Sequence, residues 1–185
     1  EAPGPSASTV WSATATAYSA TVVASGRIRF AATTGDGAAL QELDLEPTSI
    51  RRDGRDLARL GALVATADGV ELPRGVATER VARAGAGIEQ SWAFPGRPEG
   101  AGDLVVAVRA TGAPFVGQDE RGLRFGAPRF AAVIRYGTAT WIDAAGRRTR
   151  VDPTYAGDHI ELRLPASLVD EASYPAVLDP AVGSE

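Results

Sequence analysis

The chain has 185 residues, of which 44% are hydrophobic and 23% are charged, a balance typical of globular proteins that excludes wholesale disorder. Its formal net charge of −4 argues against nucleic-acid binding, which needs a basic stripe for the phosphates. The absence of cysteine excludes disulfides and thiolate metal sites, and no run approaches the roughly 18 apolar residues of a membrane-spanning helix.

The first residues are rich in Ala, Pro, Ser and Gly, a composition typical of linkers. We therefore interpret residues 1–12 as a linker or a processed N-terminal segment. Because the chain contains no methionine, we expect it to be a processed or excised fragment. Residues 13–180 are predicted to form one domain, with a two-lobe division near 70–86, where Gly and Pro cluster, as the alternative. Residues 181–185 are predicted to be an exit linker.

Alternation of apolar and polar side chains predicts β-strands at several places, in chain order 27–30, 87–94 and 158–164. In the last of these, Ile160, Leu162 and Leu164 point to one face and the polar residues between them to the other. Leu104–Val108 is apolar on both faces, which predicts a central strand that is covered twice.

Between these segments Gly and Pro recur at short intervals and mark hairpins or meanders. Many short strands at this spacing predict an all-β fold, namely an antiparallel β-sandwich rich in hairpins, with at most one or two short helices. The candidate helices cover Arg55–Leu60 and Pro165–Asp170, the second with proline near its start.

The closing segment Tyr174–Pro180 is predicted to be the last strand followed by a stiff hinge. Pro175 suits the first residue or the edge of a strand, because proline has no N–H to donate. Asp179 precedes proline and is therefore pushed away from helical geometry. Autoproteolysis at Asp179–Pro180 lacks a nearby nucleophile in the sequence, so the structural interpretation is preferred.

The only histidine, His159, lies on the polar side of a predicted strand next to Asp158. A Ser–His–Asp constellation needs a histidine between a nucleophile and a carboxylate. Adjacent strand residues point to opposite faces, so Asp158 is expected to be poorly placed to orient the imidazole. We therefore interpret His159 as a surface residue, and a zinc site is not expected from one His and no Cys.

Carboxylates are the remaining catalytic option, since a glycosidase needs two of them facing across a cleft. Each candidate lies in or beside a predicted turn, where Asp usually caps its own backbone; the candidates are Asp119, Glu120, Asp143, Asp152 and Asp158. A calcium ion held by loop carboxylates is a weaker alternative, because no Asp-x-Asp-x-Asp ladder is present. The prediction is therefore no catalytic residue and no metal site.

Aromatic side chains offer another kind of site, because a flat ring stacks on the apolar face of a sugar. Tyr136, Trp141, Asp143 and Tyr155 cluster around one predicted hairpin and form the candidate ligand-binding set. The core interpretation is preferred for Trp141 and more strongly for Trp92, because such rings fill sandwich interiors. The ligand-binding interpretation stays open as the alternative.

The second half of the chain resembles a known type of module. The segments that carry the likeness are GIEQSWAFPGRPEGAGDLVVAVRATG, GLRFG, RYGTATWIDAAGRRTRV and IELRLPASLVDEASYPAVLDPAV. Together they resemble a β-rich module of large secreted or surface proteins of myxobacteria. More loosely they are similar to the region of Rhs/YD-repeat secreted proteins that ends in Tyr-Pro-Val-x-Val-Asp-Pro. The resemblance covers about residues 85–183, with Ala176 and Leu178 in place of the commoner residues. It implies an extracellular structural module and transfers no catalytic residue.

These observations predict a non-catalytic module, secreted or on the cell surface, that serves as a stalk, spacer or adhesive unit of a larger assembly. Its expected partners are neighbouring domains or subunits, without nucleic acid and without a membrane span. A carbohydrate- or ligand-binding β module is the first alternative, and a carboxylate-dependent hydrolase is the second.

Overall fold

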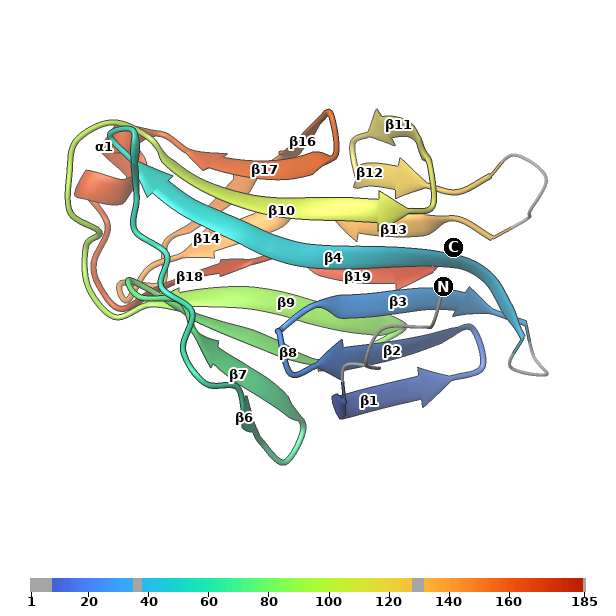
Figure 1. The fold of residues 1–185 in the computed structure, drawn as a ribbon. Helices are drawn as coiled ribbons and strands as arrows, with labels where there is room; N and C mark the ends of the chain where they lie inside the picture. The colour runs from blue at the N-terminus through green and yellow to red at the C-terminus, as the bar shows by residue number, and fades with distance from the viewer. Residues whose placement is uncertain (1–7, 35–37, 128–131, 185) are drawn as a thin grey trace.

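The computed structural model describes residues 8–34, 38–127 and 132–184, which form two antiparallel β-sheets packed face to face (Figure 1). The predicted all-β sandwich is confirmed. The first sheet has eight strands. In spatial order they are β1 (Thr9–Ala15), β2 (Tyr18–Val23), β3 (Ile28–Thr33), β4 (Ala39–Arg52), β10 (Leu104–Gly112), β17 (His159–Leu164) and β16 (Pro153–Ala156), with β5 (Arg55–Asp56) paired to β4.

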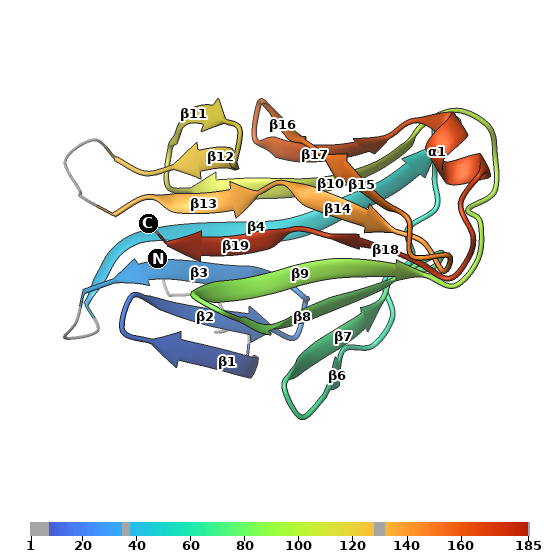
Figure 2. The same ribbon diagram turned by 180° about the vertical axis from the view of Figure 1, so that it is seen from behind.

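The second sheet has eleven strands, and its middle is built from the last residues described (Figure 2). From one edge run β6 (Val64–Ala65), β7 (Gly69–Pro73), β8 (Thr78–Ala84) and β9 (Gly87–Phe94). Next come β18 (Ala176–Asp179) and β19 (Ala181–Ser184), then β14 (Ala139–Ile142) and β13 (Ile134–Gly137). The far side holds β15 (Arg148–Val151), β12 (Gly122–Phe125) and β11 (Phe115–Asp119).

The apolar faces of the two sheets meet in one hydrophobic core cluster that includes residues from Ala13 to Val182. The alternation in the sequence put Ile160, Leu162 and Leu164 of β17 on one face, and all three side chains are fully buried in this core. Residues 70–86, where a second lobe was the alternative, lie mainly in the β7–β8 hairpin of the second sheet. The hydrophobic core cluster includes residues that come before, within and after this segment in the sequence.

One of the two predicted helices forms. Helix α1 (Ala166–Asp170) follows Pro165 and buries Val169. The helix predicted over 55–60 is wrong, because the positive φ angles of Asp53 and Gly54 turn the chain back on itself and pair β5 with β4.

Both predicted linkers are partly strands. Residues 9–12 belong to β1, and residues 181–184 form β19, which pairs with β9 and β13. Pro180 separates β18 from β19, and the backbone continues as a strand beyond it. The expected exit linker is therefore wrong for residues 181–184. Residues 1–7 and 185, which the same predictions cover, lie outside the described residues.

Candidate functional site

The four residues of the candidate ligand-binding set do not form one aromatic platform. Tyr136 lies on β13 with its side chain fully buried in the core. Its hydroxyl donates a hydrogen bond to Gln90 Oε1 at 3.3 Å, so the polar end of the ring is turned inward. Burial raises the pKa of this phenol far above its ordinary value. Tyr136 is a core residue.

Tyr155 lies on β16, in the other sheet. Its ring stacks on Phe115 at 4.6 Å between ring centroids and meets Phe125 edge to face at 5.3 Å. Gln118 of β11 donates a hydrogen bond to the carbonyl of Pro153 close by, at 3.0 Å. These contacts join the edge strands β11 and β16, so Tyr155 closes one side of the sandwich.

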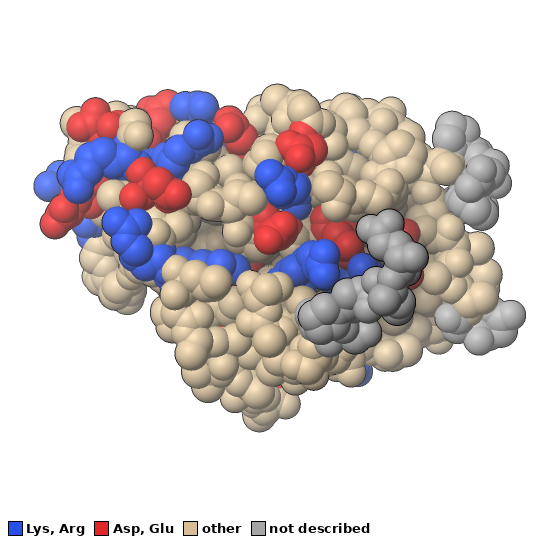
Figure 3. Space-filling view, in the orientation of Figure 1, with Lys and Arg blue, Asp and Glu red and all other residues tan. Residues whose placement is uncertain are grey.

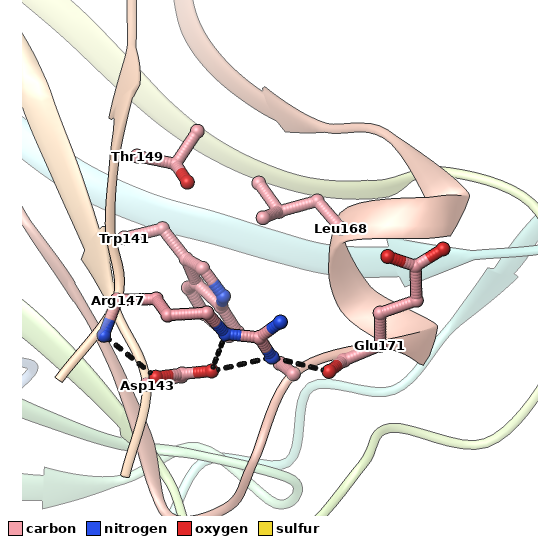
Figure 4. A pocket seen from close by; sticks show the side chains of 7 residues that line it. Trp141, Asp143, Arg147, Thr149, Leu168 and Glu171 are labelled. Carbon is pink, nitrogen blue, oxygen red and sulfur yellow. Dashed lines mark hydrogen bonds and ion pairs between the residues drawn. The ribbon is translucent and has the colours of Figure 1, made fainter. Parts of the chain in front are cut away.

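Trp141 and Asp143 do come together, in a cleft between the β14–β15 hairpin and α1 (Figure 4). The cleft has a volume of about 100 Å³. It is lined by Trp141, Asp143, Arg147, Thr149, Leu168, Glu171 and Ala172. The hairpin supplies the polar wall, and α1 with the residues that follow it supplies Leu168, Glu171 and Ala172. The cleft is therefore built from segments about 25 residues apart in sequence.

Asp143 is an ionised carboxylate that positions Arg147. It accepts hydrogen bonds from the Arg147 N–H at 2.9 Å, from Arg147 Nε at 2.8 Å and from the Ser173 N–H at 3.2 Å. Burial alone raises the pKa of Asp143, but these hydrogen bonds and the guanidinium charge outweigh it and hold the pKa below its usual value. Arg147 also donates to the carbonyl of Glu171, which joins the hairpin to the end of α1.

Trp141 leaves a polar atom without a partner at this cleft. The residue is 1% exposed, and its indole Nε1 has no hydrogen-bond acceptor in the part of the chain that is described. Figure 4 shows the indole nitrogen on the side of the ring that faces Leu168. A buried N–H without an acceptor is unfavourable, and native structures rarely leave one unexplained.

A second buried polar group lies inside the core and was missed by the sequence analysis. Glu79 of β8 is fully buried; it accepts from Arg74 at 2.7 Å and from Gln90 Nε2 at 2.8 Å. Gln90 in turn accepts from Tyr136, so four polar side chains form a chain through the interior. A signal was present, because Glu79 and Val81 share one face of an alternating segment.

His159 lies on the outer side of the first sheet. Its Nδ1 contacts the carboxylate of Asp158, which also pairs with Arg109 at 3.2 Å. The expectation that Asp158 is poorly placed to meet the imidazole is therefore wrong. Asp158 precedes β17 and belongs to a turn, so strand alternation does not govern its direction. With side chains 32% and 52% exposed, the pair is part of a surface charge cluster.

In residues 8–34, 38–127 and 132–184, no group of three or more His, Asp or Glu side chains is arranged to hold a metal ion. Within the same ranges, no helix has the length and apolar character needed to cross a membrane.

The outer edge of the first sheet carries an unusual surface. No charged residue occurs between Glu1 and Arg27 in the sequence, a stretch that contains all of β1 and β2. Figure 3 shows charged side chains gathered toward α1 and along the middle of this face, while the surface over β1 and β2 is almost wholly uncharged. Ser12 pairs with Thr21 and Thr14 with Ser19 across the two strands.

Comparison of the chain with protein-family models, with curated proteins and with solved structures found no match in any of the three.

Proposed function

We propose that this domain is a non-catalytic structural module of a secreted or cell-surface assembly, and that it joins its neighbours through the edge strand β1. The observation that supports the proposal is an edge strand without a single charged side chain. The extracellular location rests on the resemblance of residues 85–183 to modules of secreted proteins.

Edge strands usually carry features that prevent pairing with another chain. The other edges of this sandwich have them: β6 is only two residues long, β15 carries Arg148 and Arg150, β11 carries Asp119, and β16 begins with Pro153. In β1 a register shift falls between Thr9 and Trp11, and the rest of the strand is regular. Within residues 8–34, 38–127 and 132–184, no strand pairs with the outer edge of β1.

The partner that fits this edge best is β1 of a second copy, paired antiparallel about a two-fold axis. Such a contact places the same uncharged side chains opposite one another, so no like charges meet. Ser12 is the middle residue of Thr9–Ala15 and would lie nearest the axis. Backbone hydrogen bonds would then continue the first sheet from one copy into the next.

The test is sedimentation of the purified domain over a range of concentrations. The wild-type domain is expected to associate reversibly, and Ser12→Lys is expected to remain monomeric, because two ammonium groups would face each other at the axis. Thr111→Lys is the matched control: it adds the same charge to an exposed position of the central strand β10 and should associate like the wild type.

Circular dichroism would establish that both variants keep the β fold. A wild-type domain that stays monomeric at every concentration would contradict pairing through β1. Equal association of Ser12→Lys and the wild type would contradict it as well.

A further inference from the structure

A cavity of about 250 Å³ is lined by strands of both sheets and by the loop that follows β5. Its floor is apolar, because the side chains of Ile50, Trp92 and Val106 line it and each of these residues is at most 2% exposed. Leu60, in the loop after β5, also lines the cavity and is 66% exposed. The cavity therefore combines a closed apolar floor with an exposed apolar side chain at its mouth.

A bulge in β4 shapes one wall of this cavity. Ser49 is opposite Ala107, and Pro47 is opposite the next residue, Val108. Thr48 is therefore an extra residue in β4, and all three residues of this bulged segment line the cavity. A bulge bends its strand and is frequent beside functional sites.

Arg74 gives the cavity a hydrogen-bond donor that is largely buried and still accessible. Its side chain is 9% exposed; Nε donates to Glu79 Oε2 at 2.7 Å, and Nη2 lies 2.7 Å from the same oxygen. Within the described part of the chain, Nη1 has no hydrogen-bond acceptor. Unlike the indole nitrogen of Trp92, Nη1 is not one of the fully buried nitrogens, so its hydrogens are accessible at the cavity that Arg74 lines. A guanidinium held by an ion pair is preorganised to donate its unused hydrogens to an oxygen atom.

Asp56 gives the same cavity an acceptor. Its Oδ1 accepts hydrogen bonds from the N–H of Ala58 at 3.0 Å and from the N–H of Ile50 at 3.3 Å, which fix the carboxylate. No donor among the described residues forms a hydrogen bond with Oδ2. Because Glu79 neutralises Arg74, the Asp56 carboxylate leaves the cavity with a net negative charge. That charge disfavours a carboxylate or phosphate ligand.

A peptide backbone matches both polar groups. Each amide unit carries a C=O that can accept from Arg74 and an N–H that can donate to Asp56. An aliphatic side chain between two amides would cover the apolar floor. A sugar would place hydroxyls without partners against that floor, and a hydrocarbon chain would leave the Arg74 donor unused. The lining therefore favours an uncharged peptide over these alternatives.

We propose that this cavity binds an uncharged peptide segment of a partner protein, with one aliphatic side chain on the floor, a backbone carbonyl on Arg74 and a backbone N–H on Asp56. Its volume of about 250 Å³ is just below the roughly 300 Å³ at which pockets for whole ligands begin, so it encloses one side chain and the amides beside it. The inference does not depend on pairing through β1, since the residues of β1 do not line the cavity.

The experiment is NMR titration of the ¹⁵N-labelled domain with N-acetyl-leucine N-methylamide, which has one aliphatic side chain between two amides. The signal to follow is the indole N–H cross-peak of Trp92, which is identified among those of the three tryptophans by its loss in Trp92→Phe. The amide is expected to shift this cross-peak saturably, with a Kd on the order of 1 mM.

Two further compounds test the chemistry of the cavity. N-acetyl-alanine N-methylamide keeps both amides and has a smaller side chain, so it should bind roughly tenfold more weakly. N-acetyl-leucine keeps the side chain and has a free carboxylate, which the Asp56 charge disfavours, and it should also bind roughly tenfold more weakly.

Variants separate contact with the peptide from an effect on folding. Leu60→Ser removes the exposed apolar side chain at the mouth and is expected to weaken binding of the leucine amide by roughly fivefold. Val64→Ser is the matched control: Val64 is 56% exposed and does not line the cavity, so binding should be normal.

Asp56→Asn keeps an oxygen for the N–H groups of Ile50 and Ala58 and removes the charge. It should weaken binding of the leucine amide and tighten binding of N-acetyl-leucine. A general loss of structure would instead weaken both compounds, so opposite changes identify a direct contact.

Three results would overturn the proposal. The Trp92 cross-peak could stay unshifted up to saturating leucine amide, which would mean that the cavity takes no peptide. Leu60→Ser and Val64→Ser could bind equally well, which would place the peptide elsewhere. N-acetyl-leucine could bind the wild type more tightly than the amide does, which would contradict the charge argument.

Discussion

Replacing Arg74 by methionine tests whether the buried polar chain of the core is held together by charge. Arg74 and Glu79 pair at 2.7 Å, and their side chains are only 9% and 0% exposed. Methionine keeps much of the volume of the arginine stem and removes the guanidinium. The Glu79 carboxylate then keeps one described hydrogen-bond donor, the amide of Gln90 at 2.8 Å.

Removal of one partner from a buried ion pair destabilises a protein by about 3–5 kcal/mol, since an uncompensated charge is left behind. In a domain of this size each kcal/mol lowers the melting temperature by roughly 2–4 °C. Arg74→Met is therefore expected to melt about 6–20 °C below the wild type. Arg80→Met is the control: its partner Asp68 is 66% exposed, and surface pairs contribute little to stability, so this variant should melt close to the wild type.

The pH dependence gives a second measurement. Burial raises the pKa of Glu79, and the Arg74 charge opposes that rise, so its loss in Arg74→Met should raise the pKa further. An acid whose pKa is higher in the folded state binds more protons there, so stability decreases as pH rises from the unfolded value near 4.5 toward the folded one. The loss of stability that Arg74→Met causes relative to the wild type should therefore become smaller as pH falls.

The assay is thermal unfolding followed by circular dichroism at pH 5 and pH 8. The double variant Arg74→Met/Glu79→Leu should recover most of the loss, because no unpaired charge remains. If Arg74→Met melts within the range of Arg80→Met at both pH values, the pair does not stabilise the core as argued. Failure of the double variant to recover would instead assign the loss to packing.

Two further predictions concern the second sheet. A Cβ on Gly87 would lie 1.9 Å from the carbonyl oxygen of Val182, so Gly87→Ala should push β9 and β19 apart. Urea unfolding should show a loss of stability of about 1–3 kcal/mol. Gly96→Ala is the control and should be neutral, because a Cβ there would meet no atom within 4 Å. The side-chain hydrogen bonds from Arg135 lower the pKa of Asp119 to about 2, so its stabilising effect is present above the unfolded value of 3.8 and is lost as pH falls through about 2. Arg135→Met should therefore raise the pKa of Asp119, and an NMR titration that found this pKa unchanged would contradict the argument. Equal unfolding of Gly87→Ala and Gly96→Ala would contradict the prediction for Gly87.

The sequence predicted those strands whose two faces differ in polarity. β9 and β17 alternate clearly and were predicted from that pattern. Apart from Val10 and Trp11, β1 is built from Thr, Ser and Ala, which contrast little in hydropathy, and residues 9–12 were predicted as linker together with the Pro- and Ser-rich residues before them. β19 follows Pro180 and contains Gly183, and such residues normally mark the end of a strand. In this sheet, pairing with β9 and β13 overrides that local signal.

The candidate site was predicted only in part. Trp141 and Asp143 meet at one cleft because both come from one hairpin, which sequence spacing can indicate. Leu168 and Glu171 join them through α1, and no sequence spacing shows which hairpin that helix will cover. Tyr136 and Tyr155 were assigned to the same set by proximity along the chain, but they belong to different sheets.

The position of β18 and β19 in the middle of the second sheet means that this sheet can be completed only after the last described strands have been synthesised. A ribosome makes residues 176–184 after every other strand of the sandwich, so β9 waits with an open edge during synthesis. During that interval another extended chain could occupy the vacant position, and the nascent protein depends on protection or speed to avoid this. A chain truncated after α1 should accordingly accept a synthetic peptide covering the missing strands and regain its native spectrum.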